Sequence, residues 1–204
     1  MKRFANRQEA GRALAARLAE RPWHDPLVLG LPRGGVPVAK EIARELNAEL
    51  DVVVARKIGA PGHPEYGVGA VTADGEPIYD RRVLKALNLT EEQLGRTCDE
   101  ERAEAARRTT LYRKDRPLTV KDRDVILVDD GLATGVTARA ALHWVHKHEP
   151  RSVTLAVPVA ARDSLSTFTT PIVAILVPRH FGAVSRWYDR FDQTTDAEVL
   201  RALS

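Results

Sequence analysis

The sequence predicts an α/β protein with a doubly wound, mainly parallel sheet that is flanked by helices on both faces. Short apolar segments alternate with helical segments along the chain, as in folds built from repeated strand–helix–strand units. The apolar segments 27–31 and 125–128 lack the apolar–polar alternation of a half-exposed strand. Continuous apolar runs are typical of central strands that are covered on both faces.

The first half of the chain contains two predicted helices and several predicted strands. Asn6 and Glu9 form a capping pattern for the first helix, which ends before Pro22. The strand 27–31 turns into a second helix, because Pro37 suits a first helical turn and apolar residues recur every four positions after it. The other expected elements are a valine-rich strand at 50–55, a loop at 58–66 rich in proline and glycine, a strand at 67–72, a turn at 73–76 and an extended segment at 77–79.

The second half begins with helices and returns to alternating strands and helices. Thr90 and Gln93 form a capping pattern for a long helix that ends near Lys114. Its acidic residues lie mainly near the N-terminus and its basic residues near the C-terminus, which complements the helix dipole and indicates a solvated surface. The other expected elements are helices at 81–87 and 136–148, strands at 125–128, 153–157 and 172–177, a short helix near Ser164, and a last helix from Asp196.

These elements predict one domain that covers residues 1–204. Its core is expected at about 27–72 and 117–177. A helical insert is expected at about 80–116, and a small tail over the core, called the hood below, at about 178–204. The carboxyl ends of the strands share one edge of a parallel sheet, so the loops that follow them should form one site.

Composition and charge limit the possible functions. The 204 residues are 44% hydrophobic and 29% charged, which is typical of a globular protein. The longest apolar runs are strand-sized and the first residues lack the apolar run of a signal peptide, so we expect a cytoplasmic protein without membrane contact. The single cysteine, Cys98, fits a reducing compartment. The net charge of +3 is dispersed and aromatic residues make up 5%, which argues against nucleic-acid binding.

Residues 125–137, Val-Ile-Leu-Val-Asp-Asp-Gly-Leu-Ala-Thr-Gly-Val-Thr, carry the strongest functional pattern. The apolar strand ends at Asp129 and Asp130, whose carboxylates could accept hydrogen bonds from sugar hydroxyls or hold a hydrated cation. A loop with two glycines and two threonines then leads into a helix, where unpaired N–H groups bind phosphate. A phosphate site beside a carboxylate pair indicates a phosphorylated ribose. The alternative is an ordinary strand–turn–helix.

This stretch resembles the 5-phosphoribosyl-1-pyrophosphate (PRPP) signature of type I phosphoribosyltransferases, which combines a hydrophobic run, an acidic pair and Gly-x-x-Thr-Gly-x-Thr. The resemblance implies transfer of a 5-phosphoribosyl group from PRPP to a nitrogenous base or amine, with release of pyrophosphate and dependence on Mg²⁺. Asp129 and Asp130 would bind the ribose hydroxyls directly or through a Mg²⁺ ion that the two carboxylates hold through water. The 5′-phosphate would be bound by Gly131, Leu132, Ala133, Thr134, Gly135, Val136 and Thr137.

The turn at 31–35, Leu-Pro-Arg-Gly-Gly, connects a strand to a helix and is a second candidate anion site. Gly30 and Gly35 have the glycine spacing of a nucleoside-triphosphatase P-loop, but the two residues after Gly35 are not Lys and Ser/Thr. The turn resembles instead the family's pyrophosphate loop, which often contains a non-proline cis peptide. Arg33, Gly34 and Gly35 would then bind pyrophosphate through backbone amides. A plain tight turn is the alternative.

Arg56 and Lys57 end the predicted strand 50–55. In the family, a basic residue at this place contacts pyrophosphate, and the following loop, here 58–67, closes over the site. Solvated charges are the alternative. The resemblance assigns catalytic roles to Asp129, Asp130, Lys57 and Arg33.

Trp187 and Tyr188 lie in the hood, the segment that stacks on the nucleobase in this family. The resemblance makes them candidates for base stacking, and a hydrophobic clasp of the tail onto the core is the alternative. The hood matches no member whose acceptor can be transferred, so the acceptor is not identified. A non-catalytic PRPP- or nucleotide-binding regulator on the same fold is the second hypothesis, and the chain could form a homodimer.

Overall fold

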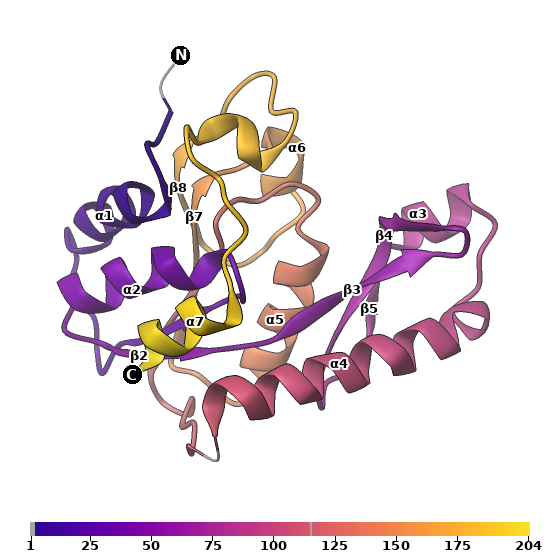
Figure 1. Cartoon of the computed structure of the whole chain (residues 1–204), viewed down its shortest axis with the longest axis horizontal. Coiled ribbons are helices and arrows are strands. Elements are labelled where there is room, and N and C mark those ends of the chain that lie inside the picture. Colours follow the sequence, from indigo (N-terminus) through magenta and orange to yellow (C-terminus); the bar gives the residue numbers. More distant parts are fainter. Residues whose placement is uncertain (1–2, 115) are drawn as a thin grey trace.

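A computed structural model describes residues 3–114 and 116–204, except for the side chain of Glu65. It contains a five-stranded parallel sheet with helices on both faces and a separate three-stranded antiparallel sheet (Figure 1). The predicted fold class is confirmed. Within the described residues, no helix is both long and apolar enough to cross a membrane.

The central sheet has the strand order β2-β1-β6-β7-β8. The chain runs from β1 outward to β2 and later returns to the other side of β1, so the order reverses between β1 and β6. Ligands of such sheets bind beyond the carboxyl ends of the strands at this switch point. The strands are β1 (Leu27–Gly30), β2 (Glu49–Val52), β6 (Asp124–Val128), β7 (Ser152–Val159) and β8 (Ile172–Leu176).

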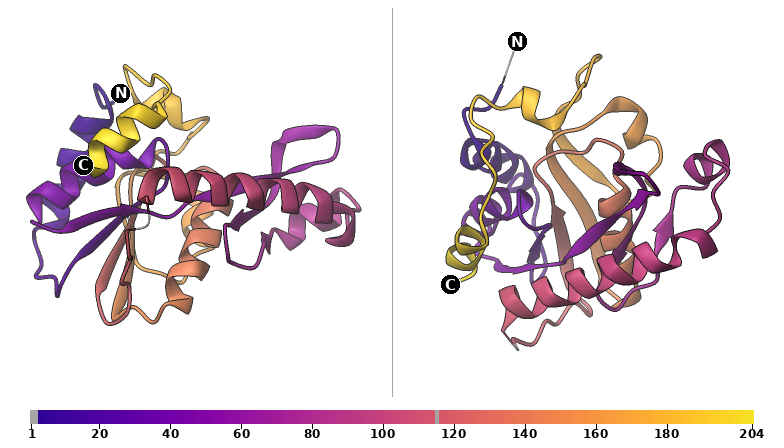
Figure 2. Two further views of the ribbon diagram at one scale, coloured as in Figure 1. Left: turned by 60° about the horizontal axis from the view of Figure 1, so that its bottom comes forward. Right: turned by 45° about the vertical axis from the view of Figure 1, so that its right-hand side comes forward.

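Helices cover both faces of this sheet (Figure 2). Val28 packs against α1 (Arg7–Leu18) and α2 (Gly35–Glu45), whereas Leu27 and Leu29 pack on the opposite face against α5 (Val136–Lys147). Successive residues of β1 are therefore buried on opposite sides, which explains the absence of alternation in its sequence. The short helix α6 (Arg162–Leu165) follows β7.

The capping patterns act as the sequence predicts, with one shift. The Oδ1 atom of Asn6 accepts a hydrogen bond from the N–H of Glu9 at 2.9 Å and begins α1. Thr90 and Gln93 exchange hydrogen bonds at the start of a short 3₁₀ helix, η1 (Glu92–Leu94), and the long helix α4 (Gly95–Arg113) begins later than expected, without a side-chain cap. The remaining helices are α3 (Arg81–Ala86), the 3₁₀ turn η2 (Val184–Trp187) and α7 (Asp196–Leu203).

The region 50–67 differs from the prediction. The expected strand at 50–55 ends at Val52, and β3 (Ala55–Ala60) forms a second sheet with β4 (His63–Thr72) and β5 (Ile78–Tyr79). The expected irregular loop at 58–66 is therefore wrong. Its glycines and prolines indicated a loop, but they lie in an antiparallel hairpin with an irregular register, and Ile58 packs with Val68 in a small core of its own. Closure of this hairpin over a ligand stays a prediction.

The insert and the C-terminal segment approach the central sheet from different sides. Helix α4 extends from the antiparallel sheet to α7 near the C-terminus (Figures 1 and 2). Tyr112 of α4 donates a hydrogen bond to Oδ1 of Asp196 in α7 at 2.5 Å. The segment before α7 lies along the N-terminal residues, where the N–H of Phe4 donates to the carbonyl of Trp187 at 2.9 Å.

Candidate active site

The loop from Asp129 to Gly135 connects β6 to α5 and is anchored to β7 by its backbone. The N–H of Leu132 donates to the carbonyl of Val159, and the N–H of Ala161 donates to the carbonyl of Leu132, both at 2.8 Å. These two bonds fix the middle of the loop, so its last residues lead directly into α5.

The start of α5 has the features of a phosphate site. Gly135 has a φ of +73°, a left-handed conformation that favours glycine, and as the N-cap it gives no side-chain bond to the first N–H groups. Thr134 is exposed and Thr137 half-buried. Neither hydroxyl is hydrogen-bonded to another residue in the described part of the chain. N–H groups and hydroxyls are therefore positioned for an anion at the predicted place.

Asp129 and Asp130 follow β6 directly and are both mostly buried. The N–H of Asp130 donates to Oδ1 of Asp129 at 2.8 Å, and Oδ2 of Asp130 accepts a hydrogen bond from Nε of Arg7 at 2.9 Å. Burial raises the pKa of Asp129 well above its ordinary value, and the charge of Asp130 raises it further. Burial also raises the pKa of Asp130, although Arg7 lowers it in part. The pair thus forms a site that a cation or hydroxyl donors would stabilise.

The turn after β1 meets the acidic pair. A methyl carbon added to Gly34 would lie 2.0 Å from Oδ2 of Asp130, so this position has no room for a side chain. The peptide between Pro32 and Arg33 is a non-proline cis peptide, as the resemblance to the pyrophosphate loop suggested. Nη1 of Arg33 lies 3.7 Å from Oδ1 of Asp196. The structure therefore brings the predicted pyrophosphate loop and the predicted ribose-binding carboxylates together.

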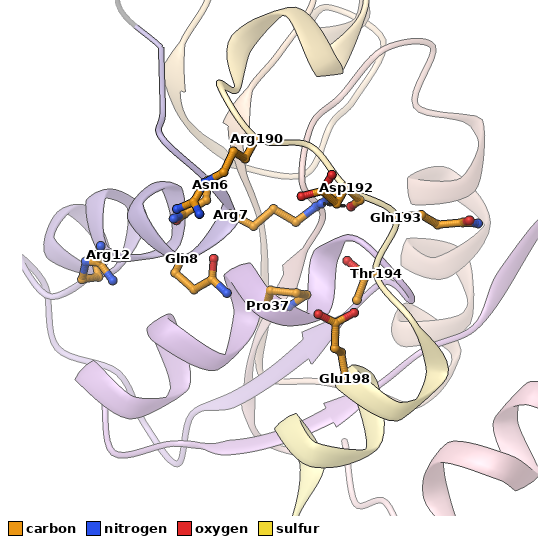
Figure 3. A pocket seen from close by; sticks show the side chains of 10 residues that line it. All are labelled: Asn6, Arg7, Gln8, Arg12, Pro37, Arg190, Asp192, Gln193, Thr194 and Glu198. Atoms are coloured by element: carbon orange, nitrogen blue, oxygen red, sulfur yellow. Dashed lines mark hydrogen bonds between the residues drawn. The ribbon is translucent and has the colours of Figure 1, made fainter.

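Arg33, Gly34 and, of the acidic pair, Asp130 border a cavity of about 490 Å³, which we call the acidic-pair cavity. Its lining residues come from α1, the turn after β1, the loop after β6 and the hood: Arg7, Arg33, Gly34, Asp130, Val184, Phe191, Gln193 and Thr194. A second cavity of about 340 Å³ shares Arg7, Gln193 and Thr194 with it (Figure 3). The hood thus forms one wall of the predicted site.

Arg56 and Lys57 occupy different surroundings. Nε of Arg56 lies 2.8 Å from Oε2 of Glu101 in α4, and the described lining of the acidic-pair cavity does not include Arg56. The predicted pyrophosphate contact of Arg56 stays a prediction. A methyl carbon added to Gly67 would lie 2.8 Å from Cδ of Lys57 and 3.6 Å from Cγ1 of Val136. This places Lys57 near the start of α5, and its pyrophosphate and catalytic roles stay predictions.

Trp187 and Tyr188 require a correction. They are only 4% and 3% exposed and pack with Phe4, so neither ring is open to a stacked base. The indole N–H of Trp187 donates to the carbonyl of Phe181 at 3.0 Å, and the hydroxyl of Tyr188 donates to the carbonyl of Asp130 at 2.6 Å. The structure favours the clasp that joins the tail to the core.

The acidic pair fits the predicted Mg²⁺ site by the chemistry of its donors. Mg²⁺ prefers oxygen ligands and is commonly held by one or two carboxylates together with substrate phosphates. Asp129 and Asp130 supply two carboxylates, and the Arg7 ion pair involves only Oδ2 of Asp130. In the described parts of the chain, no group of three or more His, Cys, Asp or Glu side chains could hold a metal ion.

Arg7 is the site residue that the sequence did not reveal. It lies 123 positions from Asp130, so no local pattern connects them. One signal was available, because Arg7 is the first residue of α1, where the helix dipole disfavours a cation. Arg81 and Arg162, however, begin α3 and α6 in the same way and are exposed, so this signal was too weak to identify Arg7.

Known proteins resemble this chain over most of its length. The family model for the phosphoribosyl transferase domain matches residues 3–167. A Mycobacterium tuberculosis (strain ATCC 25618 / H37Rv) protein, named provisionally as a phosphoribosyl transferase, is 41% identical over 209 residues, which are 100% of this chain and 47% of that protein. The chain therefore spans about half the length of this curated relative. The bifunctional protein PyrR of Nitrosococcus oceani is 30% identical over 170 residues, 82% of this chain and 72% of that protein.

Solved structures agree with these sequence matches. The crystal structure of TT1426 from Thermus thermophilus aligns with a TM-score of 0.83 and 43% identity, and covers 98% of this chain and 97% of that chain. The AQ2163 protein of Aquifex aeolicus aligns with a TM-score of 0.55 and 15% identity over 97% of this chain and 86% of that chain, which shows a shared fold alone.

Proposed function

Because this chain belongs to the phosphoribosyl transferase family, we propose that it transfers the 5-phosphoribosyl group of PRPP to a nitrogenous base or amine in the cytoplasm, with release of pyrophosphate. One observation carries the proposal. The turn at Gly34 lies against Asp130, and the loop that begins with Asp130 ends at the start of α5. Apart from Arg56 and Lys57 in β3, the residues predicted to bind pyrophosphate, ribose and 5′-phosphate thus come from two neighbouring loops at the switch point of the sheet, which supports the proposal.

Each subsite has a role that suits its chemistry. Residues 131–137 would bind the 5′-phosphate through N–H groups and hydroxyls, and Asp129 and Asp130 would accept hydrogen bonds from the ribose hydroxyls. Arg33, Gly34, Gly35 and Lys57 would bind the departing pyrophosphate. Displacement at the anomeric carbon passes through a cation-like state, so the protein acts mainly by orienting its ligands and stabilising the leaving charge.

Asp129 and Asp130 would also hold Mg²⁺. When bound, the ion would supply positive charge that stabilises the departing pyrophosphate. The chain's own residues would hold the ribose in place and exclude water, with which hydrolysis would compete.

The alternative is a non-catalytic PRPP- or nucleotide-binding regulator on the same fold. Among the described residues that line the acidic-pair cavity, Asp130 is the only carboxylate, and that lining contains no histidine. Binding of PRPP or a nucleotide without turnover needs no general base, so this lining also suits a regulator.

Measurement of pyrophosphate release distinguishes the transferase from the regulator. The protein with PRPP and Mg²⁺ should release pyrophosphate when the correct base or amine is added, and Asp129→Asn with Asp130→Asn should abolish the release. PRPP binding without release across a broad panel of bases and amines would favour the regulator. Absence of PRPP binding would contradict the transferase and would leave only a regulator that binds a nucleotide instead.

A further inference from the structure

Arg7 contacts three separate parts of the structure around the acidic-pair cavity. Its Nε donates to Oδ2 of Asp130 at 2.9 Å, and its Nη1 donates to the carbonyl of Asp192 in the hood at 2.7 Å. Its guanidinium carbon lies 3.9 Å from the centre of the Phe191 ring. One side chain therefore connects α1, the acidic pair and the hood.

The ion pair of Arg7 and Asp130 is shielded from water. The two side chains are 11% and 15% exposed, so solvent weakens their attraction much less than that of a surface pair. The planar guanidinium can donate in two directions and stack on a ring at once, which a lysine ammonium cannot do. This geometry fixes the position of Oδ2 of Asp130 and does not involve the other oxygen of that carboxylate.

The backbone extends the same connection. The N-terminal residues and the hood lie side by side, since the N–H of Asp189 donates to the carbonyl of Phe4 at 2.8 Å and the N–H of Arg190 donates to that of Ala5 at 3.1 Å. Figure 3 shows the Arg7 side chain reaching from α1 to Asp192, just beyond this paired segment. The attachment of the hood therefore continues through Arg7 to the acidic pair.

We propose that Arg7 is a positioning residue that couples the acidic pair to the hood. It orients Asp130 for the ribose hydroxyls and holds residues 191–194 against the acidic-pair cavity. The inference rests on the proposed function for the identity of the ligand, whereas the coupling itself belongs to the ligand-free protein. Loss of Arg7 should therefore change both PRPP binding and the protection of the hood.

Four variants test this coupling. Arg7→Gln removes the charge, and Arg7→Lys keeps it without the planar fork. Asp130→Asn weakens the pair from the other side. Arg12→Gln is the matched control, because Arg12 belongs to the same helix and its side chain is 56% exposed, 4.0 Å from Glu41. Arg12 lines the second cavity of about 340 Å³ but not the acidic-pair cavity. Calorimetry with PRPP and Mg²⁺, and with inorganic phosphate alone, measures binding, and hydrogen exchange of residues 184–194 without ligand measures the hood.

Arg7→Gln should weaken PRPP binding by about tenfold or more, as expected for a hydrogen bond between charged groups. It should leave phosphate binding unchanged and increase exchange at 190–194. Arg7→Lys should restore part of the PRPP affinity, Asp130→Asn should also increase exchange at 190–194, and Arg12→Gln should match the wild type.

Unchanged PRPP affinity or unchanged hood exchange in Arg7→Gln would overturn the proposal, because the coupling requires both effects. Equal loss of PRPP and phosphate binding would also overturn it, since that result describes general damage to the site. If Arg7→Gln does not fold, exchange in Arg7→Lys and Asp130→Asn decides, and protection equal to the wild type in both rejects the coupling. If the wild type does not bind PRPP, the proposed function fails, and the same exchange experiment still tests whether Arg7 couples the acidic pair to the hood.

Discussion

Replacement of Gly34 by alanine should disrupt the site through one added carbon. The backbone of Gly34 has φ −64° and ψ −32°, which alanine adopts without strain, so the effect would come from contact alone. The new carbon would lie 2.0 Å from Oδ2 and 2.7 Å from Cγ of Asp130, whereas non-bonded carbon atoms prefer about 3.5–4.0 Å. The carboxylate would have to move by more than about 1 Å, which would break its 2.9 Å bond to Arg7.

The expected loss of stability follows from the overfilled contact and the broken hydrogen bond. An overfilled contact costs about 1–3 kcal/mol, and loss of a hydrogen bond between charged groups costs about 1.5–3 kcal/mol. The two costs overlap if the carboxylate simply rotates, so we expect the free energy of unfolding to fall by at least about 2 kcal/mol, or about 4–8 °C in melting temperature. PRPP binding should be lost as well, because the displaced carboxylate is the predicted ribose ligand.

Thermal unfolding and calorimetry with PRPP and Mg²⁺ measure the two effects. Gly95→Ala is the matched control, because Gly95 is also helical and an added carbon there would have no neighbour within 4 Å. In an Asp130→Ala background the stability cost of Gly34→Ala should largely disappear, since the clashing carboxylate is gone. A Gly34→Ala protein as stable as the wild type, or one with the same cost in both backgrounds, would refute the reasoning.

Three further changes probe separate parts of the account. Thr134→Val should weaken PRPP binding by about tenfold, as expected for a hydroxyl bond to a charged group, while Thr134→Ser should retain it in calorimetry; equal affinities would remove Thr134 from the phosphate site. The raised pKa of Asp129 means that the folded protein holds this proton more tightly than the unfolded chain, so ionisation of Asp129 lowers stability as pH rises above the ordinary value of 3.8. Thermal unfolding in metal-free buffer should therefore show that Asp129→Asn is more stable than the wild type at pH 7, and that this difference in stability shrinks toward pH 3.8. A stability difference that does not change with pH would contradict this. Tyr112→Phe should lower the melting temperature by about 3–6 °C, because it removes the hydroxyl that donates a hydrogen bond to Asp196. The Asp196 carboxylate is 40% exposed, and a hydrogen bond of this kind contributes about 1.5 kcal/mol. An unchanged melting temperature would show that this bond between insert and hood contributes nothing.

The sequence was informative where the determining residues are adjacent. In residues 125–137, the apolar strand, the acidic pair, the glycines and the threonines all act within one loop, so their order alone predicted the strand, the turn and the helix start. Asn6 and Thr195 likewise cap their helices through neighbours three positions away.

The sequence was uninformative where packing between distant segments determines the structure. Nothing near Arg7 in the sequence points to Asp130, and nothing near Trp187 shows whether its ring is covered by Phe4 or open to a ligand. The hairpin at 55–72 was missed because glycine and proline normally favour loops, whereas here a separate small core with Leu84 and Leu94 stabilises irregular strands.

Calorimetric titration with PRPP tests the central claim most directly. The account predicts saturable binding to the wild type that requires Mg²⁺. In the Asp129→Asn, Asp130→Asn double variant, PRPP binding should be lost while inorganic phosphate still binds at the start of α5. No binding to the wild type, or equal PRPP affinity in the double variant, would contradict the claim that this edge of the sheet is a phosphoribosyl site.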